Sequence, residues 1–134
     1  ILPAPFDIEK AREAARGLPE LHPGIDAVFA ASDMIALAAI ATLHERGLRV
    51  PRDVAVVGFD DIPAAAHIFP GLTTVRQDIA EAGKVLVERM LALMQGEPAP
   101  STRIDTRLVV RDTCGGQQGP GETSFKSAAG SEWP

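Results

Sequence analysis

The chain has 134 residues, of which 46% are hydrophobic and 23% are charged, a composition typical of a globular protein with one domain. Its formal net charge of −5 does not favour direct binding to nucleic acid, and no apolar run approaches the roughly 20 residues that span a bilayer. The single Cys114 excludes an internal disulfide. The His residues lack the spacing of metal ligands, so we expect no metal. We also expect no cofactor and no membrane partner.

The first predicted element is a helix over residues 7–18, because apolar residues recur there at helical spacing and Asp7 can cap the first turn. Pro19 interrupts this pattern, and we expect a loop over 19–24. Residues 26–31 form a short apolar run, which is typical of a strand buried on both faces.

A second helix is predicted over residues 33–46, with Ser32 or Asp33 as its N-cap. Apolar side chains cover more than one face of this helix, so both of its sides must be buried. One side would pack on the sheet. The other would be covered by a second subunit, which we favour, or by another part of the polypeptide.

The most apolar stretch, residues 54–59, is rich in Val and predicts a second buried strand. Asp60 and Asp61 follow it directly. A strand, a helix and a second strand in this order predict a right-handed βαβ unit with parallel strands. Asp33 and Asp60 would then share the edge of the sheet where the carboxyl ends of parallel strands meet, which is where α/β folds bind ligands.

The remaining predicted elements are an irregular stretch over 62–71, an extended segment over 72–76, a long helix over 78–95 and a strand over 104–111. Asp78 caps the long helix. Its apolar stripe, expected to face a core, contains Ile79, Gly83, Leu86, Met90 and Leu93. After residue 114 the composition shifts to Gly, Ser, Gln and Glu. We therefore expect a folded domain over 1–114 and a disordered tail over 115–134.

Four motifs resemble the C-terminal half of LacI/GalR-family transcriptional regulators, and they occur in the same order and spacing. They lie at residues 29–36 (FAASDMIA), 47–61 (GLRVPRDVAVVGFDD), 72–77 (LTTVRQ) and 108–111 (LVVR). The resemblance covers about residues 5–114. It implies an α/β fold of the periplasmic-binding-protein-like type I class, a parallel-sheet three-layer sandwich. This chain would hold the C-terminal lobe and an incomplete piece of the N-terminal lobe.

The resemblance also implies a function. A small effector, in this family usually a sugar or a nucleobase and here in the first place a sugar, would bind between two lobes. It would control operator DNA binding by an N-terminal helix-turn-helix that is absent here. The chain opens on Ile1 rather than Met, so we expect it to be part of a longer polypeptide. Such a regulator would be a cytoplasmic homodimer. The long helix over 78–95 would pack in the N-terminal lobe, so in this chain its apolar stripe would lack cover.

The resemblance assigns effector-binding roles to residues at the strand ends. Asp60 matches the family's effector-contacting aspartate, although a turn or cap after a strand is the simpler interpretation of an isolated Asp. Ser32 stands where the family commonly has Asn, which leaves the identity of the effector open. Asp33 is predicted equally as an N-cap or a site residue, and Gln77 matches a position that can face the cleft. Asp61 is predicted to be structural.

A dimer interface is implied on the second helix and on the irregular stretch that follows the second strand. Its residues would be Met34, Leu37, Ala38, Ala41, His67 and Ile68. This assignment agrees with the apolar faces of the helix.

Two other classes of function are compatible with the strand-end acids. The first is a solute-binding receptor of a sugar transport system with the same fold. The second is an enzyme that uses Asp60 and Asp61 as an acid–base or metal-binding pair. Adjacent residues of a strand point to opposite faces, and no nucleophile or phosphate-binding loop stands at a recognisable spacing, so we do not expect an enzyme.

Overall fold

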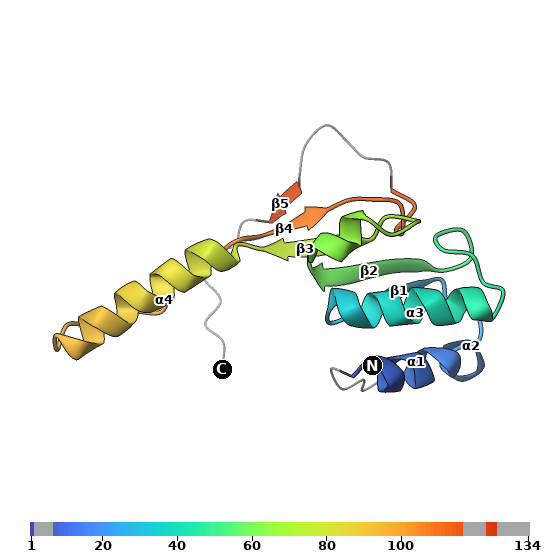
Figure 1. The fold of residues 1–134 in the computed structure, drawn as a ribbon, viewed down its shortest axis with the longest axis horizontal. Helices are drawn as coiled ribbons and strands as arrows, with labels where there is room; N and C mark the ends of the chain where they lie inside the picture. The colour runs from blue at the N-terminus through green and yellow to red at the C-terminus, as the bar shows by residue number, and fades with distance from the viewer. Residues whose placement is uncertain (2–6, 117–122, 126–134) are drawn as a thin grey trace.

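A computed structural model describes residue 1, residues 7–116 and residues 123–125 of the chain (Figure 1). One sheet organises the fold, with strands in the order β1 to β5. The strands are β1 (Ala27–Phe29), β2 (Ala55–Asp60), β3 (Thr73–Gln77), β4 (Thr106–Val109) and β5 (Thr123–Phe125). The first three are parallel, and β4 and β5 are each antiparallel to the strand before them. The parallel arrangement predicted for the first two strands is therefore confirmed.

The helices lie mainly in layers beside this sheet. They are α1 (Ile8–Arg16), α2 (Leu18–Leu21), α3 (Asp33–Glu45), the 3₁₀ helix η1 (Pro63–Ala66) and α4 (Ile79–Met94). Figure 1 shows α3 between the sheet and α1. Small and branched side chains allow this close packing, and the core formed by α3 and the central strands contains Ala36, Ile40, Leu43, Val54, Val56 and Leu72.

The caps predicted for three helices are confirmed. Asp7, Ser32 and Asp78 each accept a hydrogen bond from a backbone N–H in the first turn of α1, α3 and α4. This arrangement satisfies one of the N–H groups that lack a partner at a helix N-terminus. The predicted boundaries of these helices differ from the structure by at most two residues, and the predicted start of α3 at Asp33 is the observed one.

Three predicted irregular segments contain regular structure, and one of them, the stretch over 62–71, contains the 3₁₀ helix η1. The loop expected over 19–24 begins inside α2, because Pro19 occupies the first turn, where a missing N–H costs no hydrogen bond. The tail expected to be disordered contributes β5, whose backbone pairs with β4. The rest of that tail, 117–122 and 126–134, lies outside the described residues.

The second side of α3 is covered in part by α1 of the same chain. Ala11 and Ala15 of α1 are buried, and Arg12 forms an ion pair with Glu45 of α3. Part of the apolar surface of α3 is therefore covered by its own chain, and a second subunit is not needed to cover that part. The expectation that a second subunit covers the entire second side of α3 is corrected accordingly.

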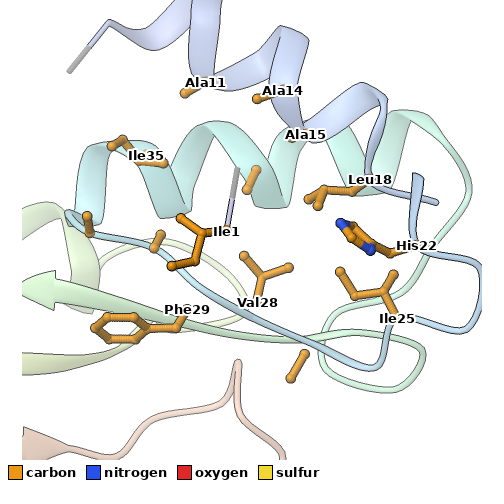
Figure 2. A pocket seen from close by; sticks show the side chains of 14 residues that line it. Ile1, Ala11, Ala14, Ala15, Leu18, His22, Ile25, Val28, Phe29 and Ile35 are labelled. Atoms are coloured by element: carbon orange, nitrogen blue, oxygen red, sulfur yellow. The ribbon is translucent and has the colours of Figure 1, made fainter. Parts of the chain in front are cut away.

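An apolar groove remains open between α1, α3 and the edge strand β1 (Figure 2). Its volume is about 560 Å³, and Val28 and Phe29 of β1 lie on its floor opposite Ala15. Helix α4 is the other exposed apolar element. It projects away from the sheet (Figure 1), and Ile79, Leu86 and Leu93 are each more than half exposed. Among the described residues, none buries this stripe, as expected for a helix that packs in another lobe.

Candidate functional site

Three polar side chains lie at the carboxyl ends of the parallel strands. Ser32 follows β1, Asp60 is the last residue of β2, and Gln77 is the last residue of β3. The register pairs Asp60 with Arg76, which places Gln77 one residue beyond the end of β2. The strand-order argument predicted Asp33 and Asp60 at this edge, and the structure has Asp60 there, beside Gln77.

Asp60 is the centre of this edge. Its Oδ1 accepts a hydrogen bond from Nε2 of Gln77 at 2.8 Å. Its side chain also borders a strand-end pocket of about 330 Å³, lined by Asp7, Ile8, Ser32, Met34, Ile35 and Asp60. A carboxylate that is half exposed keeps lone pairs for further donors, and the Gln77 amide offers both a donor and an acceptor. Hydroxyl groups are suitable partners for such a pair.

Ser32 has a double role at this pocket. Its side chain lines the pocket, and its Oγ accepts a hydrogen bond from the N–H of Ile35 at 3.3 Å. The extended backbone of Ser32 and this bond make it the N-cap of α3. A hydroxyl has one donor and two acceptor lone pairs, so it can cap the helix and still face a ligand.

Asp33 does not belong to the pocket, and its assignment as an effector-binding residue is corrected. Its side chain is fully buried, with Oδ1 accepting from Thr74 Oγ1 at 2.6 Å and Oδ2 accepting from the N–H of Ile62 at 2.8 Å. Gly58 lies directly beneath it, and a Cβ there would overlap Oδ1. The missing side chain at residue 58 leaves room for the carboxylate of Asp33 to turn into the fold.

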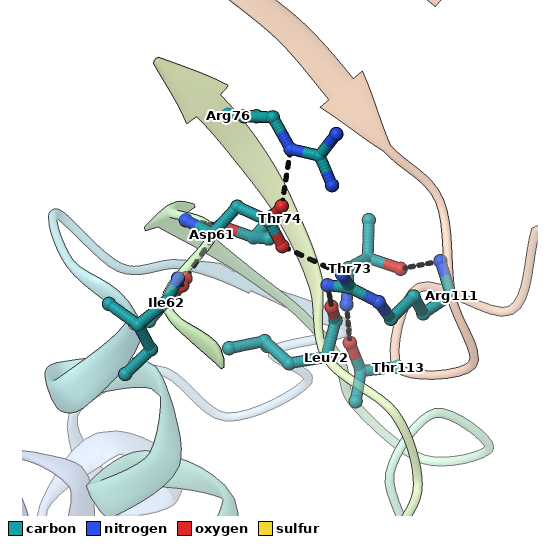
Figure 3. A network of polar contacts seen from close by, with 9 residues as sticks. Asp61, Ile62, Leu72, Thr73, Thr74, Arg76, Arg111 and Thr113 are labelled. Atoms are coloured by element: carbon teal, nitrogen blue, oxygen red, sulfur yellow. Dashed lines mark hydrogen bonds and ion pairs between the residues drawn. The ribbon is translucent and has the colours of Figure 1, made fainter. Parts of the chain in front are cut away.

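Asp61, the residue after Asp60, points into a cluster of charges (Figure 3). Its carboxylate is 5% exposed and forms ion pairs with Arg76 and with Nη2 of Arg111, the latter at 2.7 Å. We call Asp61, Arg76 and Arg111 the Asp61 cluster. Burial by itself raises the pKa of Asp61, but the hydrogen bonds from Arg111 and Arg76 outweigh burial and hold this pKa below its usual value. This agrees with the structural role predicted for Asp61.

The segment after β4 fastens the Asp61 cluster to the sheet. Arg111 donates from its backbone N–H to Thr73 Oγ1 at 2.8 Å and from Nη1 to the carbonyl of Leu72 at 2.7 Å. Thr113 donates to the carbonyl of Val56 at 2.7 Å. Residues far apart in the sequence therefore hold the ends of β2 and β3 together.

Sequence reasoning missed several of these supporting residues. Arg76 and Arg111 lie inside the motifs LTTVRQ and LVVR, but no pattern indicated that they meet at Asp61. Thr74 joins Asp33 to Asp61 because it also accepts from the N–H of Asp61 at 3.4 Å. The available signal was the pair of adjacent threonines, Thr73 and Thr74, in a predicted extended segment, because buried hydroxyls need polar partners.

The residues predicted at a dimer interface divide into two groups. Met34 and His67 are exposed, and Leu37, Ala41 and Ile68 are half-buried, so these five contribute surface. Ala38 is only 5% exposed because other parts of its own chain bury it, so its assignment to the interface is corrected.

In the part of the chain that the structure describes, no helix is long and apolar enough to cross a bilayer.

Comparison with known proteins agrees with this geometry. The periplasmic binding protein-like domain family matches residues 3–114. The ribose operon repressor of Halalkalibacterium halodurans is 40% identical over 118 residues, which are 87% of this chain and 36% of the repressor. The chain thus spans about a third of the length of that curated relative.

Solved structures give the same result. A complex of the transcriptional regulator CelR with cellobiose superimposes with a TM-score of 0.75 at 38% identity, covering 82% of this chain and 34% of CelR. The lac repressor dimer bound to its operator and the anti-inducer ONPF gives a TM-score of 0.77 at 30% identity, covering 83% and 34%.

The fold and the strand-end site thus define a partial periplasmic-binding-protein-like domain. The chain belongs to the periplasmic binding protein-like domain family, in the form of the effector domain of LacI/GalR-type regulators.

Proposed function

We propose that this chain is the effector-sensing and dimerisation portion of a LacI-type transcriptional regulator, with its domain over residues 1–114. The effector is a small neutral sugar. The observation that carries the proposal is the hydrogen-bonded pair of Asp60 and Gln77 at the carboxyl ends of β2 and β3, beside Ser32 and the strand-end pocket. The similar CelR structure is a complex with cellobiose, which supports a sugar as the ligand class.

The side chains at the pocket suit a sugar in chemical terms. Asp60 accepts charge-assisted hydrogen bonds from hydroxyls, and these are stronger than bonds between neutral groups. Asp7 and Asp60 are the charged residues that line the strand-end pocket, and both are acidic. Ile8, Met34 and Ile35 add apolar surface for the C–H face of a sugar ring. This side of the cleft therefore favours an uncharged polyhydroxylated guest over an anion.

The environment of Asp61 supports a regulatory role over a catalytic one. Asp61 is buried and paired with two arginines, so it does not converge with Asp60 as an acid–base pair. The relatives reported above are repressors and regulators by name. We propose that this protein likewise acts on DNA, in the cytoplasm, through a helix-turn-helix outside the chain described here.

Dimerisation is the third part of the proposal. The surface formed by Met34, Leu37, Ala41, His67 and Ile68 combines the half-buried side of α3 with the segment after η1. A dimer would cover this apolar surface. The lac repressor structure with a similar fold is a dimer, which supports a homodimer here.

The binding proposal is tested by Asp60→Asn in the full polypeptide that the gene encodes. The amide keeps the size of the side chain but removes its negative charge and one acceptor. Isothermal titration with ribose, cellobiose and lactose is expected to give a dissociation constant at least about tenfold higher for the sugar that the wild type binds, since a bond to a charged group contributes roughly 1.5–3 kcal/mol.

Asp53→Asn is the matched control, because Asp53 lies in the turn before β2 and pairs with Arg49. It should leave sugar affinity unchanged. Equal affinity of wild type and the Asp60→Asn variant would remove Asp60 from the binding site.

A further inference from the structure

The turn that follows β2 has an uncommon backbone. Asp60 has a φ of 111° and Asp61 a φ of 55°, both in the positive region that residues other than glycine rarely adopt. Two consecutive residues in this region need their conformation to be imposed by surrounding contacts. In this chain the first of the two presents its carboxylate to the strand-end pocket.

Two backbone hydrogen bonds and the Asp61 cluster hold this turn. The N–H of Asp61 donates to Thr74 Oγ1 at 3.4 Å, and the N–H of Ile62 donates to Asp33 Oδ2 at 2.8 Å. The strongest is the Asp61 cluster itself, in which each carboxylate oxygen receives a different arginine (Figure 3). Arg76 comes from β3 and Arg111 from the segment after β4, so the carboxylate of Asp61 is fixed from two elements.

We propose that Asp61 is a positioning residue of the effector site. By anchoring its own carboxylate in the Asp61 cluster, it fixes the direction of the preceding residue, so that Asp60 reaches Gln77 and the strand-end pocket together. This inference rests on the proposed function, because it assigns Asp61 a part in recognition of the same sugar. It adds that recognition depends on a residue that does not touch the ligand.

A positioning role of Asp61 differs from a purely stabilising role in its effect on specificity for the sugar. If Asp61 only stabilised the fold, its loss would lower the melting temperature and leave the folded site unchanged. If it positions Asp60, its loss changes the angle at which the Asp60 carboxylate meets a hydroxyl. Hydrogen bonds weaken steeply with poor angles, so affinity and discrimination between epimers would both fall.

The experiment compares the wild type with Asp61→Asn in the full polypeptide. The probes are cellobiose and lactose, which differ in the configuration at one carbon, titrated by calorimetry. We expect the better-bound sugar to lose at least about tenfold in affinity, which corresponds to 1.4 kcal/mol, and the ratio of the two affinities to approach one. Asp53→Asn, which also removes an acid from an ion pair, should change neither value. Unchanged affinity and unchanged ratio in Asp61→Asn would overturn the inference.

A second variant and a second measurement keep the test decisive. Arg111→Lys retains the charge but loses the planar fork that reaches both Asp61 and the carbonyl of Leu72, and it should reduce the ratio to a smaller extent. Crystal structures of the variants should show Asp60 Oδ1 and Gln77 Nε2 separated by more than 3.5 Å.

A retained bond of 2.8 Å between Asp60 and Gln77 in both variants would overturn the inference even if the wild type bound neither sugar. Failure of the wild type to bind any sugar would instead count against the proposed function.

Discussion

Thr74 donates a hydrogen bond from its Oγ1 to Oδ1 of Asp33 across 2.6 Å, and both side chains are fully buried. This bond joins the first turn of α3 to the middle of β3. It also directs the other oxygen of Asp33 to the N–H of Ile62, just beyond the turn that carries Asp60. One buried carboxylate thus links a helix, a strand and the loop that follows Asp60.

Replacement of Thr74 by Val tests the contribution of this bond. The shape of the side chain is kept, but Oδ1 of Asp33 loses its donor in the interior, and a buried unsatisfied group costs about 1–3 kcal/mol. The free energy of unfolding, measured by urea titration, should fall by that amount. Thr42→Val is the matched control, because the carbonyl of Ala38 that Thr42 contacts also accepts the ordinary helical N–H bond. An equal loss in both variants would contradict this account.

Gly58→Ala should be destabilising because the strand has no room for a Cβ at this residue. The added methyl group would overlap Asp33 Oδ1 and lie 3.1 Å from Cδ2 of Leu72. Overpacking of this kind costs about 1–3 kcal/mol.

The control for this variant is Gly83→Ala in α4, where a Cβ would meet nothing within 4 Å. Alanine favours a helix interior over glycine by about 1 kcal/mol, so this variant should be the more stable one. Thermal unfolding of the two variants should therefore shift in opposite directions.

Ser32→Ala should cost about 1 kcal/mol, because it removes the cap of α3, whereas Ser32→Asn should retain stability since Asn caps helices equally well. The two variants separate capping from recognition. If Ser32 also contacts the sugar, calorimetry should show a changed order of preference among sugars for Ser32→Asn despite its normal stability. An unchanged order would limit Ser32 to the cap.

The ion pair of Arg49 and Asp53 predicts a pH dependence with a definite sign. Hydrogen bonds from Arg49 lower the pKa of Asp53 to about 2 in the folded chain, whereas an unfolded Asp has a pKa of about 3.9. A lowered pKa means that the stabilisation is present above the unfolded value and is lost as pH falls through the folded value. Asp53→Asn should thus be less stable than the wild type at pH 7, and the difference should shrink between about pH 4 and pH 2. Urea midpoints that keep a constant difference over this range would refute the assignment.

Ala41→Asp tests the proposed homodimer. Ala41 is half-buried on α3, and a charge at this residue would have to lose its hydration in a subunit interface. Sedimentation of the full polypeptide should shift from dimer to monomer for Ala41→Asp and remain dimeric for Ala41→Ser. A dimer that persists in both variants would place the interface elsewhere.

Much of the fold could be predicted because its signals are local. The Val-rich run before Asp60 indicated a central strand, and caps such as Asp7 and Asp78 marked helix starts that the structure confirms. Parallel order then predicted that Asp33 and Asp60 follow neighbouring strands at one edge, and the structure has Asp60 there, whereas Ser32 and Gln77 were assigned by the family resemblance.

What could not be predicted depends on contacts between distant residues. Asp33 turns inward because Gly58, far along the chain, leaves space beneath it. Arg111 reaches Asp61 only because β4 returns antiparallel to β3. Ala38 is buried by other parts of its own chain, which periodicity alone does not reveal.

The short connection between β3 and α4 ties the long helix to the binding edge. Only Asp78 separates Gln77 from the first residue of α4, and its carboxylate is already held by the N–H of Glu81 at 3.0 Å. A tilt of α4 must therefore be absorbed by the few backbone torsions around Asp78, or it must displace the Gln77 amide that is bonded to Asp60. The orientation of α4 and the position of the Gln77 side chain beside Asp60 are therefore coupled through a single residue, Asp78.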